Sequence, residues 1–515
     1  MGESLAPGSF NLPQGTMVML WIGILVYMIG MLAIGWFSSR KVTEMSDFLV
    51  AGRRLPLWMA TATLLATWFG AGSSMGVAAT VYADGVNSVI ADPFGASISL
   101  LLAGVFIVGM LRKKGCLTVT DIIETRYGKG AGIYASLWMV PVYIGWLGAQ
   151  LLGLGTILHL LTGINVTTGT IIGAAVVLIY TCAGGMWAVT LTDVVQVVIM
   201  IAGLVFLLPG AIELAGGGEA LLKALRPEDT LAPVGAANFN DYVYYIGSWI
   251  IMGLGCMVGQ DLIQRSLSSK NSSVAIASSM MSGFFYMLIG LIPITIGIAA
   301  RIILPKYGIT SEVMGDNLEN QVLPRIAMLV MGKSYPLLLT IFIAALTAAI
   351  MSSADSSLLA GASLLCNNVM APLFPKMRAQ GLLISTRITT VVLTVIALVL
   401  AIWVKSIYAL MINSWISQLV IIFIPVMTAL FVPKAGKYAA WATMIVGTVT
   451  WLGYTFIVSC GIRLPFAQLL DSTEFDRALT CGAVYGFAAA LLTFLCCYAG
   501  ERIVKDEEPP AEAKD

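Results

Sequence analysis

The stretch TAAIMSSADSSLLAGASLL, from Thr347 to Leu365, is where this sequence departs most clearly from an ordinary apolar segment. Four serines and an aspartate crowd into the six positions from Ser352 to Ser357, inside a long apolar run. A charged side chain at the centre of a bilayer costs about 2.5–3.5 kcal/mol on insertion scales. An acid such as Asp355 in a membrane span therefore indicates a functional site.

The composition of the chain is that of a polytopic membrane protein. Of its 515 residues, 58% are hydrophobic and only 11% are charged, and the mean hydropathy is +0.91. A soluble domain carries about 25% charged residues, because a compact globule needs a wettable surface. The lipid bilayer is therefore the expected surrounding. The net charge of +1 indicates no nucleic acid partner, and no feature indicates an obligate protein partner.

Enzymatic chemistry is not expected. The chain has one histidine, His159, and eight scattered cysteines without a C-x-x-C pattern. A zinc centre needs clustered Cys and His ligands, and nucleophilic catalysis by a histidine base needs a paired nucleophile. We expect neither, and no cofactor other than a coupling ion.

Apolar segments of spanning length recur along the chain, separated by short polar breaks. A span needs about 20 apolar residues, and backbone in lipid must satisfy its hydrogen bonds within a helix. The sequence predicts an all-α protein with thirteen transmembrane helices, at about 16–37, 57–82, 89–111, 131–161, 167–184, 187–214, 239–263, 272–303, 336–366, 383–404, 406–431, 438–460 and 475–500.

Positive charge predicts the orientation and the ends of the domain. When the connections are taken alternately, one set holds about two thirds of the 28 Lys and Arg residues, and the positive-inside rule places it in the cytoplasm. Residues 1–15 are then extracellular or periplasmic, and residues 16–503 form the transmembrane domain. The segment 504–515 is a disordered cytoplasmic tail. The cell, or cytoplasmic, membrane is the expected location.

Four acids lie within predicted spans: Asp92, Asp193, Asp261 and Asp355. No Lys or Arg lies well inside a span beside them, so each acid needs another cation, such as a bound metal ion or a cationic substrate. The alternative is a protonated carboxyl that is hydrogen-bonded to a neighbouring helix.

Helical spacing organises the opening stretch. Residues three and four apart share a face, so Ala349 lies with Ser352 and Ser353, and Ser352 lies with Asp355 and Ser356. Hydroxyls and carboxylates are the hard oxygen donors that hard cations require. Close packing of small residues also explains the serines, but it does not explain the aspartate.

Glycines interrupt two of the predicted spans. Gly70 and Gly72 lie in the middle of the second span, and Gly253, Gly255 and Gly259 precede Gln260 in the seventh. Discontinuous helices at corresponding positions of two repeats indicate the midplane site of a transporter. A tight packing face is the alternative interpretation.

Five motifs carry a resemblance that covers about residues 15–505. In their order and spacing they resemble the sodium:solute symporter family. They are FLVAGRRLPLW (Phe48–Trp58), LATWFGAGSSMG (Leu65–Gly76), GGMWAVTLTDVVQ (Gly184–Gln196), LIQRSLSS (Leu262–Ser269) and AAIMSSADSS (Ala348–Ser357).

The resemblance implies a five-plus-five inverted-repeat, LeuT-like core at about 57–431, and alternating access driven by a sodium gradient. Sodium is the only metal it implies. It maps the principal sodium site onto Ala66, Phe69, Ala349, Ser352 and Ser353. It maps a second site, for sodium or a proton, onto Asp193, Ser352, Asp355 and Ser356.

Within the family, the motifs are most similar to the high-affinity choline transporter branch. Trp68 and Trp146 match two positions of that branch's aromatic cage, whereas two other cage positions are occupied by Ala96 and Gly259. Asp92 falls where sugar-transporting relatives carry a pocket acid. The expected solute-binding residues are Trp68, Ser73, Asp92, Trp146, Gln260, Asp261 and Tyr408.

The sequence therefore predicts a secondary active symporter that imports a small organic solute with sodium. Two acids and two tryptophans favour a cationic or amine-bearing solute, choline-like or polyamine-like. A neutral polar solute or a monocarboxylate remains the alternative, as does coupling to protons instead of sodium.

Overall fold

The computed structural model describes residues 13–39, 50–309, 319–332, 334–376, 379–459 and 473–507. These residues are almost entirely helical and contain no named β-strand, as the sequence predicts. The first part of the chain forms α1 (Gln14–Ser39), η1 (Ala51–Arg53), α3 (Leu57–Trp68), η2 (Gly72–Gly76), α4 (Val77–Asp84), η3 (Val86–Val89), η4 (Ile90–Gly95), α5 (Ala96–Ala103), η5 (Gly104–Val108), α6 (Gly109–Lys114), α7 (Thr120–Tyr127) and α8 (Lys129–Thr162).

The middle of the chain contains the second interrupted span. It forms α9 (Val166–Ala215), α10 (Gly218–Lys223), α11 (Phe239–Gly253), η6 (Gly255–Val258), α12 (Gln260–Ser268), α13 (Ser272–Lys306), η8 (Glu319–Gln321) and α15 (Val322–Met331). The last part forms α16 (Pro336–Ser363), η9 (Leu364–Met370), α17 (Ala371–Leu373), α18 (Ala379–Val404), α19 (Ile407–Ser414), η10 (Gln418–Phe423), α20 (Ile424–Phe431), α21 (Lys437–Ser459) and α22 (Thr473–Glu507).

Most of these helices are suited to a membrane. Among the described residues, 10 helices are long and apolar enough to cross one, and the bent pair of α3 with η2 and α4 raises the number to 11. The multi-pass character is therefore confirmed, whereas the number of thirteen spans stays a prediction. Three shorter apolar stretches of helix also occur: Gln14–Tyr27 within α1, Val166–Ile179 within α9, and Val322–Met331, which is α15.

Both predicted interruptions are confirmed. The second span bends by 60° between α3 and the segment that begins with η2. The seventh span is divided into α11, η6 and α12, and Gly259 has an extended backbone with φ −64° and ψ 133°. In contrast, the two spans predicted at 167–184 and 187–214 lie in one helix, α9, whose 50 residues correspond to about 75 Å of α-helix.

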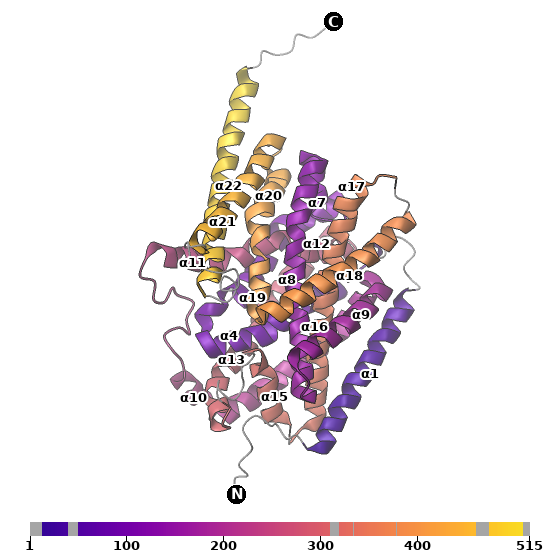
Figure 1. Ribbon diagram of the computed structural model, residues 1–515, viewed down its shortest axis with the longest axis vertical. Helices are drawn as coiled ribbons and strands as arrows, with labels where there is room; N and C mark the ends of the chain where they lie inside the picture. Colours follow the sequence, from indigo (N-terminus) through magenta and orange to yellow (C-terminus); the bar gives the residue numbers. More distant parts are fainter. Residues whose placement is uncertain are drawn as a thin grey trace.

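The opening stretch lies in α16, which packs against α9, α8 and α1 in the middle of the bundle. In Figure 1, α1 lies at one side of the molecule, and α21 and α22 lie together at the opposite side. All residues from Thr347 to Ser363 of α16 are buried. The serines and the acid of this stretch therefore face other helices and not lipid.

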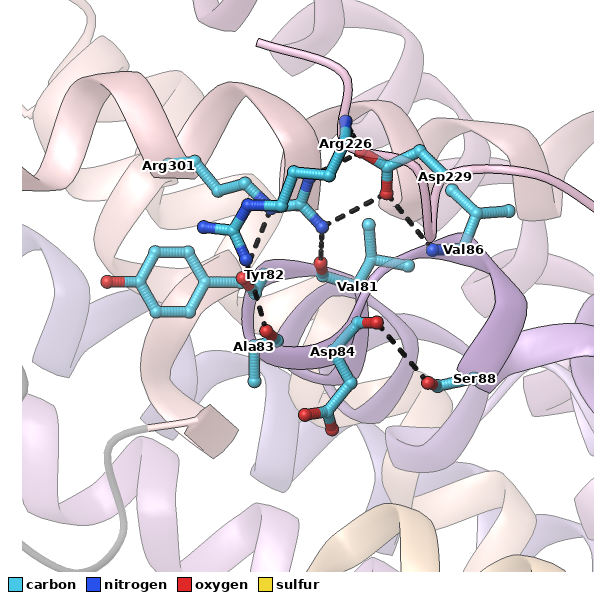
Figure 2. Close-up of polar contacts among 9 residues, drawn as sticks. All are labelled: Val81, Tyr82, Ala83, Asp84, Val86, Ser88, Arg226, Asp229 and Arg301. Atoms are coloured by element: carbon cyan, nitrogen blue, oxygen red, sulfur yellow. Dashed lines mark hydrogen bonds and ion pairs between the residues drawn. The ribbon is translucent and has the colours of Figure 1, made fainter. Parts of the chain in front are cut away.

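A cluster of polar contacts ties the segment 224–232 to the ends of α4 and α13 (Figure 2). Arg301 donates to the two carboxylate oxygens of Asp229, at 2.5 and 3.1 Å. Asp229 also accepts from the backbone N–H groups of Val86, at 3.1 Å, and Arg226, at 2.8 Å. The Asp229 side chain is fully buried and that of Arg301 is 5% exposed, so the pair is shielded from solvent.

The same arginines cap the C-terminal end of α4. Arg301 donates to the carbonyls of Val81 and Tyr82, and Arg226 donates to the carbonyl of Ala83 at 3.3 Å. The last carbonyls of a helix lack intrahelical partners, and positive charge is favourable there. The cluster therefore fixes the end of the broken second span that is predicted to face the outside of the cell.

The pKa of Asp229 sets the pH range over which this cluster stays intact. Burial would raise the pKa of Asp229, but the hydrogen bonds from Arg301 and from the Arg226 and Val86 amides outweigh it and hold the pKa below its ordinary value of 3.8. A lowered carboxyl pKa stabilises the fold above the ordinary value and ceases to do so as the pH falls through the lowered one. The cluster is therefore intact at neutral and mildly acidic pH.

The substitution Asp229→Asn is expected to lower the thermal unfolding midpoint of the purified protein. It keeps the shape of the side chain but leaves the Arg301 guanidinium buried without its counter-charge, which costs about 3–5 kcal/mol in buried pairs. The matched control is Glu219→Gln, which removes the pair with Lys223, whose side chains are 76% and 81% exposed. Equal midpoints for the two variants would contradict a structural role for the buried pair.

Candidate functional site

The site is built around the interruption of the second span. In a continuous helix, the N–H of Gly70 would bond to Ala66 and the N–H of Ala71 to Thr67. Here Gly70 N–H bonds two residues back, at 3.1 Å, and Ala71 N–H donates to Oε1 of Gln150 at 2.9 Å. The two carbonyls lose their helical partners and become available to other donors or to a cation.

A serine of the opening stretch lies against this break. The hydroxyl of Ser353 donates to the carbonyl of Thr67 at 2.7 Å, across the contact between α16 and α3. Ala66 and Phe69 flank that carbonyl on α3, and Ala349 lies one turn before Ser353 on α16; all are buried. The structure thus brings Ser353 to the break, next to Ala66 and Phe69 in the chain, whereas the hydroxyl of Ser352 bonds to Asp193.

Asp193 joins the next turn of α16 to α3. Its two carboxylate oxygens accept short hydrogen bonds from the hydroxyls of Ser352 and Thr63. The hydroxyl of Ser356 donates to the Ser352 carbonyl at 2.7 Å. Three of the four residues predicted for the second ion site, Asp193, Ser352 and Ser356, are thus brought together.

Asp355, the fourth residue, contacts another part of α9. One carboxylate oxygen accepts a short hydrogen bond from the hydroxyl of Thr181, and the other, Oδ2, has no hydrogen-bond partner among the described residues. The side chain is 0% exposed. The structure shows no hydrogen bond that joins Asp355 to the Asp193 cluster within the described part of the chain.

A buried guanidinium corrects the expectation that no basic residue accompanies the acids. Arg265 is 2% exposed, donates a short hydrogen bond to Ser356, and interacts electrostatically with Asp193 and Asp261. The expectation was wrong because α12 begins inside the bundle, after the interruption at Gly259, and so keeps its last turn buried.

Asp92 anchors one polar corner of the candidate solute site. It accepts hydrogen bonds from the hydroxyls of Ser73, at 2.6 Å, and Tyr286, at 2.8 Å. The Ser73 hydroxyl also lies 3.0 Å from the carbonyl of Trp68, next to the break. The predicted residues Ser73 and Asp92 are therefore in contact, and neutral hydroxyls surround the acid.

Asp261 lies beneath a cluster of aromatic rings. It accepts from the indole N–H of Trp68 at 2.6 Å and from the hydroxyl of Tyr143 at 3.1 Å. The Trp415 ring centroid lies 5.4 Å from that of Trp146, 6.3 Å from that of Tyr143 and 6.4 Å from that of Trp68. These are the distances of rings in direct contact, so the four rings form one packed cluster.

Two of the predicted solute residues lie at the edge of this cluster. Both ends of the Gln260 amide are engaged with the backbone of Leu117 and Val119, at 3.3 and 2.9 Å. Tyr408 packs against the far end of η2, beside Gly76. In the described structure neither side chain bonds to the carboxylate of Asp92 or Asp261, although Tyr408 lies close to the backbone of Asp92.

Several residues of the site were missed by the sequence analysis. Threonine and tyrosine are common in membrane helices, so a single one carries no signal. Arg265 could have been found, because it lies four residues after Asp261 and helical periodicity places both on one face. The missed residues are Thr63, Tyr143, Thr181, Arg265 and Tyr286.

Comparison with protein families identifies the family of the chain. The model of the sodium:solute symporter family matches residues 48–447, which include both interrupted spans and α16. The chain belongs to the sodium:solute symporter family. It is therefore a multi-pass transporter and not an enzyme, and sodium-coupled symport is its general activity.

Named relatives of this symporter are transporters of different solutes. It is 27% identical over 443 residues to the high affinity choline transporter 1 of Homo sapiens, covering 84% of this chain and 75% of that protein. It is 24% identical to the sodium/pantothenate symporter of Haemophilus influenzae, covering 88% of this chain and 92% of that protein.

Solved structures show the same fold. A Na⁺-coupled sialic acid symporter in a substrate-bound outward-open state matches with a TM-score of 0.70 at 18% identity, covering 92% of this chain and 98% of that one. The nucleobase-cation-symport-1 family transporter Mhp1 matches with a TM-score of 0.57 at 14% identity, covering 89% and 96%. The symporter therefore has the LeuT-like fold that the sequence predicts.

The substitution Gly70→Ala is expected to impair sodium-dependent uptake. An added Cβ would lie 2.5 Å from the Ser353 hydroxyl and 2.6 Å from Gln150 Oε1, so one of them must move. The sodium concentration for half-maximal uptake should rise about tenfold, because overpacking of this kind costs about 1–3 kcal/mol. The control Gly453→Ala adds a Cβ with nothing within 4 Å. An unchanged sodium dependence in Gly70→Ala would refute the placement of Ser353 at the ion site.

Proposed function

We propose that this symporter imports a small cationic or amine-bearing solute together with one or two sodium ions. The observation that carries the proposal is that Asp261 bonds to Trp68 and Tyr143, whose rings pack against Trp415. A carboxylate with aromatic faces beside it attracts an ammonium group by charge and by cation–π interaction.

The balance of buried charge supports a cationic cargo. Asp92, Asp193, Asp261 and Asp355 are each 0% exposed, whereas Arg265 interacts with Asp193 and Asp261 among them. Buried charges are paired or coordinate metal ions, because an isolated ion loses its hydration without compensation. Sodium and an ammonium group are cations that would complete this balance.

The principal sodium ion would bind where α16 meets the break. Carbonyls of Ala66, Phe69 and Ala349 and the hydroxyls of Ser352 and Ser353 provide the five oxygen ligands. Support comes from the hydrogen bond of Ser353 to the Thr67 carbonyl, which shows that these two elements are in contact. A sodium ion there would hold the two helices together and stabilise the solute-binding form.

A second ion would use the acids of the neighbouring turn. Asp193, Ser352 and Ser356 form one cluster, and Asp355 lies one turn away with Thr181. We propose that this region binds a second sodium ion or a proton. The guanidinium of Arg265, which contacts Ser356, lowers the local need for a cation and favours one sodium ion over two.

The solute would bind between the break and α12. Trp68, Trp146 and Trp415 would supply ring faces, and Asp261 and Asp92 would supply charge. The similarity to choline transporters of Homo sapiens and other animals agrees with a quaternary ammonium or amine. The hydroxyls around Asp92 would also suit a neutral polar solute, which is the second candidate.

The orientation proposed from the charge distribution places the N-terminus outside and the C-terminus in the cytoplasm of the cell membrane. Sodium would then enter from outside, bind at α3 and α16, and be released to the low sodium concentration inside. The solute would follow because Trp68 of its site lies between Ala66 and Phe69 of the proposed sodium site in the chain.

The double variant Ser352→Ala, Ser353→Ala is expected to abolish sodium-dependent uptake into proteoliposomes. Hydrogen bonds and ion contacts to charged groups are worth about 1.5–3 kcal/mol each, so the loss of two hydroxyl ligands lowers sodium affinity more than a hundredfold, by about 3 kcal/mol or more. Normal uptake with an unchanged sodium dependence would refute the ion site.

The matched control is Ser357→Ala, Ser363→Ala on the same helix. Both hydroxyls are buried but donate to carbonyls of their own helix, those of Ala354 and Ala360. This variant removes the same atoms from α16 without touching the break. Its uptake should remain close to that of the parent protein.

Solute identity is tested with labelled compounds under an imposed sodium or proton gradient. The panel contains choline, a polyamine, an amino acid, a sugar and a monocarboxylate. An inward sodium gradient should drive uptake of an ammonium or amine compound. Uptake of the sugar or the monocarboxylate alone would overturn the solute class, and uptake driven by protons alone would overturn sodium as the coupling ion.

A further inference from the structure

A polar vestibule lies at the end of the bundle that carries α7 and α17 (Figure 1). Its volume is about 680 Å³, and this is the face predicted to be cytoplasmic. The residues that line it include Lys114, Cys116, Asp121, Glu124, Asn367 and Asn368. The vestibule ends at the segment 117–121, which connects α6 to α7.

The segment 117–121 is fastened to η9 by short polar contacts. The hydroxyl of Thr118 lies 2.8 Å from Asn368 Oδ1 and 2.6 Å from Asp121 Oδ1. The amide of Asn368 donates to Asp121 at 2.6 Å. Asp121 in turn accepts from the N–H groups of Leu117 and Thr118, so the segment is a rigid unit.

The same segment is fastened to α12 by one side chain. Gln260 accepts from the N–H of Val119 at 2.9 Å and donates to the carbonyl of Leu117 at 3.3 Å. Gln260 is the first residue of α12 and is 0% exposed. Segment 117–121, Gln260 and Asn368 therefore form a polar bridge between α12 and η9, here called the inner staple.

The inner staple adjoins the candidate solute site directly. The backbone N–H of Gln260 donates to the hydroxyl of Tyr143 at 2.6 Å, and this hydroxyl lies 3.1 Å from Asp261. One residue thus contacts the segment 117–121, whose Asp121 lines the vestibule, with its side chain and the solute cluster with its backbone. A solute that leaves Asp261 toward the vestibule has to pass this residue.

We propose that the inner staple is the inner gate of the symporter. Gln260 and Asn368 hold α12 against η9 and separate the vestibule from the solute cluster. Hydrogen bonds of this kind contribute little net free energy because water replaces them on opening, so the staple can open and close within a transport cycle. This inference rests on the proposed function only for the position of the solute site.

The position of the staple also connects it to the ion site. η9 follows α16 directly, and α16 carries Ser352 and Ser353. α12 carries Arg265, which contacts Ser356 of α16. Movement of α16 relative to α12 would therefore act on the ion site and on the staple together.

Two native cysteines on opposite sides of the staple provide the test. Cys116 lines the vestibule, whereas Cys256 is 0% exposed in η6, four residues before Gln260. Two versions of the full chain, each keeping one of these cysteines, are labelled in membrane vesicles with a membrane-impermeant thiol reagent. Burial raises the pKa of the Cys116 thiol and the nearby Asp121 adds to it, so labelling is done at about pH 8.

Gln260→Leu and Asn368→Leu are expected to increase the labelling rate of Cys256 about tenfold, because each removes the polar contacts of one side of the staple. Cys116 should be labelled at similar rates in every variant. Gln260→Glu keeps an acceptor for Val119 but loses the donor to Leu117, so its rate should be intermediate. Asn367→Leu is the control, since Asn367 lines the same vestibule but its contacts are 3.4 Å long.

Two results would overturn the gate. In one, Cys256 stays protected in both leucine variants while Cys116 is labelled normally; in the other, Cys256 is labelled equally in the parent and all variants. If a leucine variant does not yield monodisperse protein, Thr118→Val tests the same contact to Asn368 and should also raise the Cys256 rate. The assay uses no solute and no sodium gradient, so a gated labelling pattern without any uptake would refute the proposed function and leave the gate standing.

Discussion

The backbone between Trp68 and Ala71 leaves the helix inside the membrane, where water cannot replace the lost hydrogen bonds. The rest of the site depends on how these groups are satisfied. Gln150 of α8 accepts from the N–H of Ala71, and Ser353 of α16 donates to the carbonyl of Thr67. The break can therefore exist only where α8 and α16 bring polar side chains to it, and this fixes the position of both helices.

The same requirement explains why polar residues gather along α16. Its Ser352 hydroxyl bonds to Asp193 and its Asp355 carboxyl to Thr181, both of α9, and Asp193 in turn accepts from Thr63 of α3, so polar groups of one helix provide partners for another. Arg265 balances part of this buried charge, since it interacts with Asp193 and Asp261. Asp92 and Asp355 instead have hydroxyl partners, from Ser73, Tyr286 and Thr181. Under the proposed function, a bound cation would complete the balance.

The interruption at Gly259 starts a short helix, α12, that connects the sites. α12 starts at Gln260, carries Asp261 at its second position, and places Arg265 one turn later beside Ser356. One short helix therefore contacts the segment 117–121, the candidate solute cluster and the candidate ion cluster. A short helix moves as a unit, so a displacement of α12 at one of these places also displaces its residues at the others.

The sequence by itself determined the membrane class, the helical fold, the two interruptions and the family, because these depend on local composition, spacing and motifs. It also placed the proposed sodium residues Ala349, Ser352 and Ser353 on one face of a helix, since helical periodicity is local. Only the tertiary structure decided which partner each buried polar group has. It showed that Arg265 is buried beside the acids, that Asp355 contacts Thr181 apart from the Asp193 cluster, and that Gln260 holds the segment 117–121. These pairings join residues from 91 to 174 positions apart, and such contacts depend on how the helices pack, which no local pattern encodes.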